Sequence, residues 1–172
     1  SRMINARAET IEEKPSFRAA FARRRCIVPA DGYYEWFTTP QVSPKTRPAK
    51  QPFFIRDSAG AGLAMAGMYE WWRHAAPDTE SDQGAEPEPW LLTFSVITVA
   101  SAGPIAHIHD RMPAIIARDD IAVWLDPSSP MDDVRHALLA GNGEGLEAVQ
   151  VSTMVNNVRN NGPGLLEPVM AQ

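Results

Sequence analysis

Cysteine is almost absent from the chain, since Cys26 is the single copy among 172 residues. One thiol cannot form an internal disulfide, and the opening residues lack the basic stretch and apolar stretch of a secretory leader. Long apolar runs are also missing, so no segment is predicted to cross a membrane. These absences argue against a disulfide-stapled secreted scaffold and a membrane-spanning protein, and they predict a globular chain in the cytoplasm.

An excess of positive charge is lacking as well, because 16 Lys and Arg stand against 21 Asp and Glu, a net charge of -5. This balance argues against indiscriminate coating of DNA. A local basic site is still compatible with it, because much of the acid lies in residues 77–89, "PDTESDQGAEPEP", which we interpret as a flexible acidic insertion. The arginines of "RRR" (Arg23 to Arg25), together with Arg7, Arg111 and Arg159, remain available to build a positive groove.

The length and the 44% of hydrophobic residues suit one domain, residues 1–172, with a substantial core. Helical spacing predicts three helices, at Lys14–Arg25, Arg118–Pro127 and Ser129–Gly143, the last with Ser129 as N-cap. Strand-type residues occupy five stretches: Cys26–Phe37, Phe53–Arg56, Gly62–Trp72, Trp90–Ala100 and Ala148–Val155. Four prolines between Thr38 and Pro52 predict a loop. The order of these elements predicts an α+β fold, with a curved, largely antiparallel, barrel-like sheet and flanking helices.

The stretch "DGYYEW" puts an ionisable carboxylate, Glu35, inside an aromatic strand. Side chains alternate along a strand, so Tyr33, Glu35 and Phe37 share one face. Aromatic surroundings disfavour the charged carboxylate and raise its pKa toward neutrality, which suits a group that exchanges protons at pH 7. The alternative is a Glu at a strand edge that pairs with an arginine, and the stretch alone leaves both interpretations open.

Two of the four histidines, His107 and His109, lie in "AHIHDRMP" and share a face if this segment is extended. A metal site would need further ligands, but Cys26 is isolated and the other histidines lie in different predicted elements, so neither a metal nor another cofactor is expected. A surface pair without a role and proton transfer by one ring both remain open. Cys26 lies at the start of a strand, with no helix N-terminus after it to lower its pKa, which favours an inert thiol.

Four motifs in order resemble the SOS response-associated peptidase family: "NARAET" (Asn5–Thr10), "RRCIVPADGYYEW" (Arg24–Trp36), "HDRMPAII" (His109–Ile116) and "VSTMVNNVRNN" (Val151–Asn161). The resemblance runs through nearly the whole chain. It implies a protein of the DNA damage response that recognises abasic sites in single-stranded DNA and forms a covalent thiazolidine crosslink with them. It also implies related lyase and self-processing peptidase activities, and a mixed fold around a curved sheet.

By this resemblance, the family's active-site residues correspond to Asn5, Glu35 and His109. The positions that line the DNA channel correspond to Arg7, Trp36 and Arg111. The resemblance implies that the carboxylate shuttles protons, that the imidazole assists opening of the sugar ring or reversal of the adduct, and that the amide holds the sugar oxygen. The two arginines would then bind phosphates, and the indole would offer a face on which a base stacks.

The chain departs from the family pattern at the nucleophile, which in the family is a cysteine exposed as the first residue, several dozen residues upstream of "NARAET". Here Ser1 stands four residues before Asn5, and Cys26 does not match that position. We therefore expect the N-terminal portion of the domain to lie outside these 172 residues. The alternatives are a non-catalytic module for single-stranded DNA and a cysteine-type peptidase. A monomer, bound to the nucleoid when it engages DNA, is expected.

Overall fold

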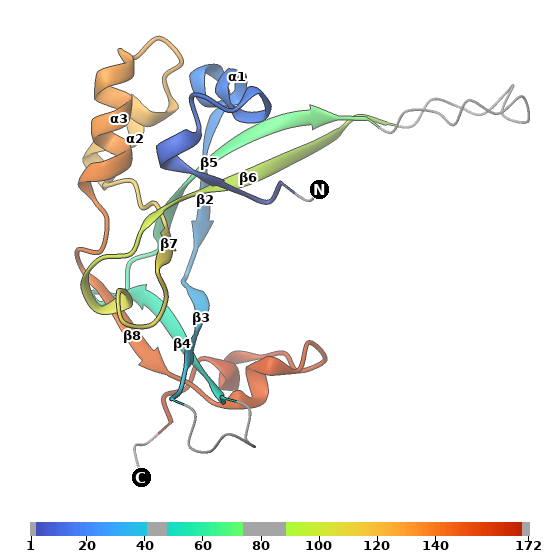
Figure 1. Cartoon of the computed structure of the whole chain (residues 1–172), viewed down its shortest axis with the longest axis vertical. Coiled ribbons are helices and arrows are strands. Elements are labelled where there is room, and N and C mark those ends of the chain that lie inside the picture. The colour runs from blue at the N-terminus through green and yellow to red at the C-terminus, as the bar shows by residue number, and fades with distance from the viewer. Residues whose placement is uncertain (1–2, 41–47, 74–88, 170–172) are drawn as a thin grey trace, which may run out of the picture.

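The chain forms two open β-sheets joined end to end, with helices over the first (Figure 1). The computed structural model describes residues 3–40, 48–73 and 89–169. The first sheet has the order β1-β6-β5-β2, with β7 beside β6: β1 Asn5–Arg7, β6 Leu91–Ala100, β5 Leu63–Trp72, β2 Arg25–Ala30 and β7 Arg111–Pro113. The second has the order β3-β4-β8: β3 Tyr33–Thr38, β4 Lys50–Asp57 and β8 Leu146–Gln150.

Neighbouring strands run antiparallel everywhere except at the edge of the first sheet, where β1 pairs parallel to β6. The predicted α+β class and the largely antiparallel pairing are confirmed. The barrel-like closure is wrong, because the stretch predicted as one strand from Cys26 to Phe37 splits into β2 and β3, which belong to different sheets. A Cβ on Gly32, between them, would lie 2.4 Å from the carbonyl oxygen of Ile55, so the chain crosses between the sheets where only glycine fits.

All three predicted helices are present and shorter than predicted: α1 Pro15–Arg23, α2 Ile121–Leu125 and α3 Met131–Ala140. The N-cap of α3 is Pro130, which offers no capping side chain, so the predicted role of Ser129 is wrong. The last strand, predicted for Ala148–Val155, ends at Gln150, and the short 3-10 helix η5, Thr153–Asn156, follows. Strand β4 begins inside the predicted loop, at Lys50.

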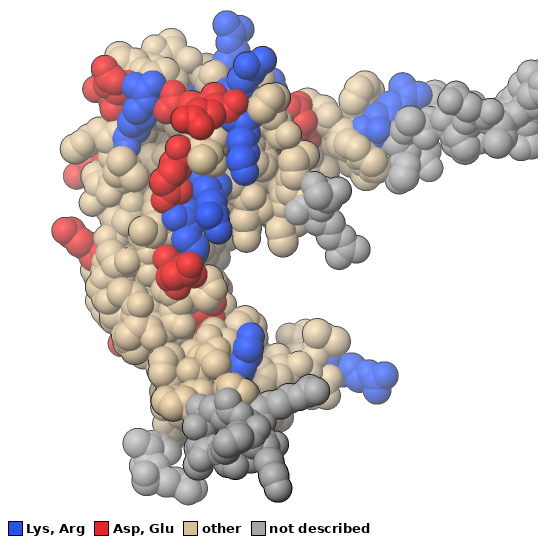
Figure 2. All heavy atoms as spheres, in the orientation of Figure 1, with Lys and Arg blue, Asp and Glu red and all other residues tan. Residues whose placement is uncertain are grey.

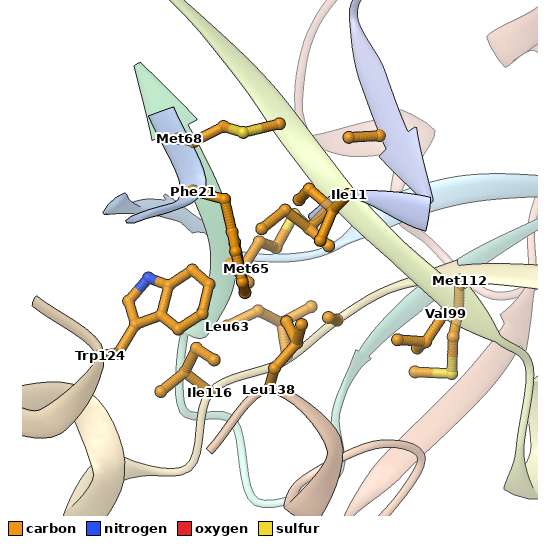
Figure 3. Packing of buried hydrophobic residues seen from close by; sticks show 14 of the residues in the cluster. Ile11, Phe21, Leu63, Met65, Met68, Val99, Met112, Ile116, Trp124 and Leu138 are labelled. Atoms are coloured by element: carbon orange, nitrogen blue, oxygen red, sulfur yellow. The ribbon is translucent and has the colours of Figure 1, made fainter. Parts of the chain in front are cut away.

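The core lies between the first sheet and the helices (Figure 3). The ring of Phe21 from α1 lies 6.1 Å from that of Trp124 from α2, and both are buried with Met65, Ile97 and Leu138. This placement agrees with the prediction that the helices cover the sheet.

Arg25 is buried in this core, and its guanidinium donates to four backbone oxygens. The acceptors lie at the C-terminal ends of two helices: Phe21 and Ala22 in α1, and Trp124 and Asp126 in and after α2. The expectation that the whole "RRR" stretch contributes to a positive groove is therefore wrong, because Arg25 has its charge turned inward.

The molecule bends around a hollow that is open on one side (Figure 2). Above this hollow, β5 and β6 extend from the body as a two-stranded ribbon (Figure 1). The ribbon exposes large apolar side chains: Trp71, Trp72, Trp90, Leu91, Leu92 and Phe94. The predicted acidic insertion lies outside the described residues, apart from Pro89. Within the described part of the chain, no helix has the length and apolarity needed to cross a membrane.

Candidate active site

Glu35 lies in the middle of β3, with its carboxylate half-buried. Tyr33 and Phe37 pack toward the core on the same face, while the rings of Tyr34 and Trp36 contact each other on the other face, 6.4 Å apart. Burial raises the pKa of the Glu35 carboxyl above its ordinary value, and the nearby His109 opposes that rise. A carboxyl group whose pKa is raised is suited to accept and return a proton near neutral pH.

His109 approaches Glu35 from the loop that follows β6. Its Nδ1 lies 3.0 Å from both the backbone nitrogen and the backbone oxygen of Arg111, and 3.3 Å from a carboxylate oxygen of Asp110. These contacts orient the ring through one nitrogen. Nε2 forms no hydrogen bond with any residue that the structure describes, so it is available to a bound molecule.

His107, the other histidine of this loop, is exposed. Among the described residues, no group of three His, Cys, Asp or Glu side chains is placed to hold a metal ion. The local chemistry is therefore that of an imidazole beside a carboxyl group.

Asn5 and Arg7 lie on the exposed face of β1, and Ala6 between them is buried against the core. The parallel pairing with β6 places Arg7 opposite Thr98. Neither Asn5 nor Arg7 forms a side-chain hydrogen bond with any described residue, although Arg7 lies close enough to Glu9 to help lower the pKa of its carboxyl. Both side chains are accessible, and among the described residues no hydrogen bond joins Asn5 to Glu35 or His109.

Arg111 lies in β7, beside β6, and its guanidinium already has partners. Nη1 and Nη2 donate to the two carboxylate oxygens of Glu9 at 2.6 and 3.0 Å, and Nη2 donates to the backbone oxygen of Thr98 at 2.6 Å. Sequence reasoning assigned no role to Glu9. The available signal was an acid two residues after Arg7, within an otherwise basic motif.

Trp36 is held from the C-terminal part of the chain, because its indole Nε1 donates to the side-chain oxygen of Asn156 at 2.7 Å. Asn156 ends η5 and lies within the fourth motif, Val151–Asn161, where sequence reasoning gave it no role. Tyr34 supports the other side of the indole, and Phe54 in turn lies 5.4 Å from Tyr34, between ring centroids. The tilted aromatic contacts and the hydrogen bond to Asn156 together fix the orientation of the indole ring.

Cys26 lies in β2, half-buried, and burial raises the pKa of its thiol. A Cβ on Gly67 in the neighbouring strand would lie 2.9 Å from its Sγ, so the sulfur packs against β5. A thiol in this position is a poor nucleophile.

The structure thus joins segments that are distant in the sequence. It brings Glu35 together with His109, and it brings Arg7, Glu9 and Arg111 together beside the loop of His109. A carboxyl group with a raised pKa beside an imidazole, flanked by cationic side chains, is an arrangement suited to proton transfer on an anionic substrate.

The chain belongs to the SOS response-associated peptidase (SRAP) family, whose model matches residues 1–158. It is 40% identical over 167 residues to the abasic site processing protein YoqW of Bacillus subtilis, covering 96% of this chain and 67% of that protein. It is 34% identical over 184 residues to the abasic site processing protein HMCES of Xenopus tropicalis, covering 96% of this chain and 50% of that protein.

The fold is also similar to that of a solved protein. A crystal structure of a protein from Bacteroides thetaiotaomicron matches with a TM-score of 0.76 and 30% identity, covering 96% of this chain and 66% of that one. The chain therefore spans about two thirds of the length of these bacterial relatives, and half of the vertebrate relative.

Proposed function

We propose that the chain recognises abasic sites in single-stranded DNA and that the protein to which it belongs forms a covalent crosslink with them, as part of the DNA damage response. The observation that carries the proposal is the half-buried Glu35 beside His109, with Arg7 nearby. The names of the relatives, abasic site processing proteins, support the same reaction class.

The chemistry begins with the abasic deoxyribose, whose ring opens to an aldehyde. A primary amine adds to that aldehyde and loses water to give a Schiff base, and an adjacent thiol then adds to the same carbon and closes a five-membered thiazolidine. Glu35 would take the proton released by the attacking groups, and Nε2 of His109 would give a proton to the ring oxygen as the sugar opens. Asn5 would hold the sugar oxygen through its amide.

The nucleophile of this proposal is an N-terminal cysteine, which supplies both the amine and the thiol. Cys26 does not fit, because a residue inside the chain has no free amine and its sulfur packs against β5. The reaction needs no cofactor. The lyase and self-processing peptidase activities implied by the resemblance would use the same groups. In the lyase reaction the Schiff base would lose a proton from the neighbouring carbon and expel the 3′ phosphate by β-elimination, which cleaves the strand.

DNA would be held by Arg7, whose accessible guanidinium suits a phosphate, and by Trp36, whose fixed ring suits base stacking. We place this protein in the cytoplasm, bound to the nucleoid as a monomer. A non-catalytic DNA-binding module is the second candidate. The exposed Arg7 and the oriented Trp36 favour it, because these two side chains need no chemistry to bind a strand.

Oligonucleotides with a single abasic site test the proposal. Both the 172-residue chain and the complete product of its gene are incubated with them, and heat-stable adducts are sought on a denaturing gel. An adduct with the abasic strand, and none with a tetrahydrofuran analogue that has no aldehyde, is expected from the complete product. Binding without an adduct in every case would leave only the second candidate.

A further inference from the structure

We propose that Lys50 is a second amine of the site: its side chain attacks the aldehyde of an abasic deoxyribose and forms a reversible Schiff base, independently of the N-terminal cysteine. The inference rests on the proposed function and adds a further nucleophile to it. Primary amines are scarce in this chain, whose only lysines are Lys14, Lys45 and Lys50. An aldehyde held at the site therefore meets few side chains that can form an imine.

Lys50 is the first residue of β4, and β3 and β4 lie below the hollow (Figures 1 and 2). The register pairs Trp36 with Pro52, and Lys50 lies two positions before Pro52. Side chains alternate along each strand, so Lys50 and Trp36 share a face of the sheet. Diagonal neighbours of this kind lie about 7 to 8 Å apart, within reach of aromatic and long side chains. A base stacked on Trp36 would therefore bring the sugar of the adjacent nucleotide close to Lys50.

The amine also lies near the carboxyl group that is suited to proton transfer. Burial has the largest effect on Glu35 and raises its pKa, while the charges of His109 and Lys50 lower it. Asp110 acts in the same direction as burial. Imine formation takes a proton from the attacking amine and gives one to the departing oxygen, so a carboxyl group beside both is the partner that the reaction needs.

The amine of Lys50 is available for attack. The residue is exposed, and its side chain forms no hydrogen bond or ion pair with any part of the chain that the structure describes. No contact therefore has to break before the amine reaches an aldehyde. The guanidinium groups of Arg7 and Arg111 cannot take this role, because arginine keeps its proton in proteins.

The reaction of a lysine differs from that of an N-terminal cysteine in its product. The neutral amine adds to the aldehyde carbon, the carbonyl oxygen leaves as water, and an imine remains. Water reverses this step and releases the lysine. Loss of a proton from the neighbouring carbon, with expulsion of the 3′ phosphate, would instead cleave the strand. A lysine carries no thiol beside its amine, so it closes no thiazolidine, and its adduct becomes permanent only when the imine is reduced.

Lys14 provides a matched control. It is exposed, and its side chain also forms no hydrogen bond or ion pair with a described residue. It directly precedes α1, and Figure 1 shows α1 at the opposite end of the molecule from β3 and β4. Lys45 lies outside the described residues, and the experiment distinguishes it from Lys50 by peptide mapping.

The test uses the complete gene product with a short extension before its first residue, which prevents thiazolidine formation. It is incubated with an oligonucleotide that carries one abasic site, with and without sodium cyanoborohydride, and the modified lysine is identified by mass spectrometry of peptides. The reduced adduct is expected on Lys50, about 10-fold or more above the amount on Lys14.

Lys50→Arg should lose this adduct and should bind a strand with a tetrahydrofuran site within about 2-fold of the parent protein, because arginine retains the positive charge. Lys14→Arg should match the parent in both measurements. Without the reductant, no heat-stable adduct should form on any lysine.

Three results would overturn the inference: no reduced adduct on Lys50, an adduct spread equally over the three lysines, or an unchanged amount of adduct in Lys50→Arg. The proposed crosslink is measured separately, as the heat-stable adduct that the gene product without the extension forms in the absence of reductant. If that adduct is missing, the proposed crosslink is refuted, and the peptide map still decides the role of Lys50.

Discussion

At the scale of single residues, Glu35 is the position where sequence and structure agree most directly. Alternation along the strand predicted that it shares a face with Tyr33 and Phe37, and that its pKa is raised, and the structure confirms both. The alternative was an ion pair between Glu35 and an arginine. No arginine among the described residues forms such a pair. The approach of His109 could not be predicted from spacing, because 74 residues separate the two in the sequence.

Replacement of Glu35 by Gln should increase the free energy of unfolding at pH 7. The folded pKa of this carboxyl lies above the ordinary value of 4.5, so the folded protein binds the proton more tightly than the unfolded chain. Stability of the wild type therefore falls as pH rises from 4.5 through the folded pKa. The advantage of the variant should shrink at pH 4, and urea unfolding at the two pH values measures it.

Glu13→Gln, an exposed position near α1, serves as the control and should leave stability unchanged at both values. If Glu35→Gln raised the free energy of unfolding by the same amount at pH 4 and pH 7, burial would not be destabilising the carboxylate. The same variant should form the adduct more slowly if Glu35 moves protons in the proposed reaction.

At the scale of elements, the arginine triplet shows how one sequence pattern is divided between different environments. Arg25 lies at the start of β2, directly after α1, and donates to carbonyl oxygens at the C-terminal ends of two helices. Arg24 forms an ion pair with Glu70 on β5. The three residues look equivalent in sequence. Their alternation at the start of a strand turns Arg25 inward, toward the ring of Trp124, 5.8 Å away.

Replacement of Arg25 by Met should lower the free energy of unfolding by about 3 kcal/mol, because it strips buried carbonyl oxygens at the ends of α1 and α2 of their donor. Urea unfolding with tryptophan fluorescence measures the loss. Arg24→Met is the matched control, since its ion pair is partly exposed and should cost less than about 1 kcal/mol. Equal losses in the two variants would contradict the structural role of Arg25.

At the scale of the whole molecule, four of the arginines that the structure describes are paired with carboxylates. Ion pairs join Arg24 to Glu70, Arg56 to Glu147, Arg111 to Glu9 and Arg135 to Glu12. Figure 2 shows the two signs of charge side by side over the upper part of the molecule, above the hollow. With a net charge of -5, attraction to DNA should depend on a few unpaired cations, and Arg7, on the exposed face of β1, is one of those near the candidate site.

Replacement of Arg7 by Ala should weaken binding to a single strand with a tetrahydrofuran site about 5-fold, and should reduce the salt slope by about 0.7, the value for one lost phosphate contact. Fluorescence anisotropy at several salt concentrations measures both. Arg18→Ala, an exposed arginine on α1, is the control and should bind as the wild type does. A salt slope that Arg7→Ala leaves unchanged would remove Arg7 from the DNA path.

The sequence by itself determined the class of fold, most of the strands and all three helices, because periodicity and turn residues act locally. It also pointed to Glu35, since a carboxyl group between aromatic residues is unusual on any strand. Only the tertiary structure decided that β2 and β3 join different sheets, that Arg25 is buried, and that Glu9 occupies Arg111. These outcomes depend on contacts between residues about 20 to 100 positions apart, and the packing that creates them leaves no trace in the spacing of residues along the chain.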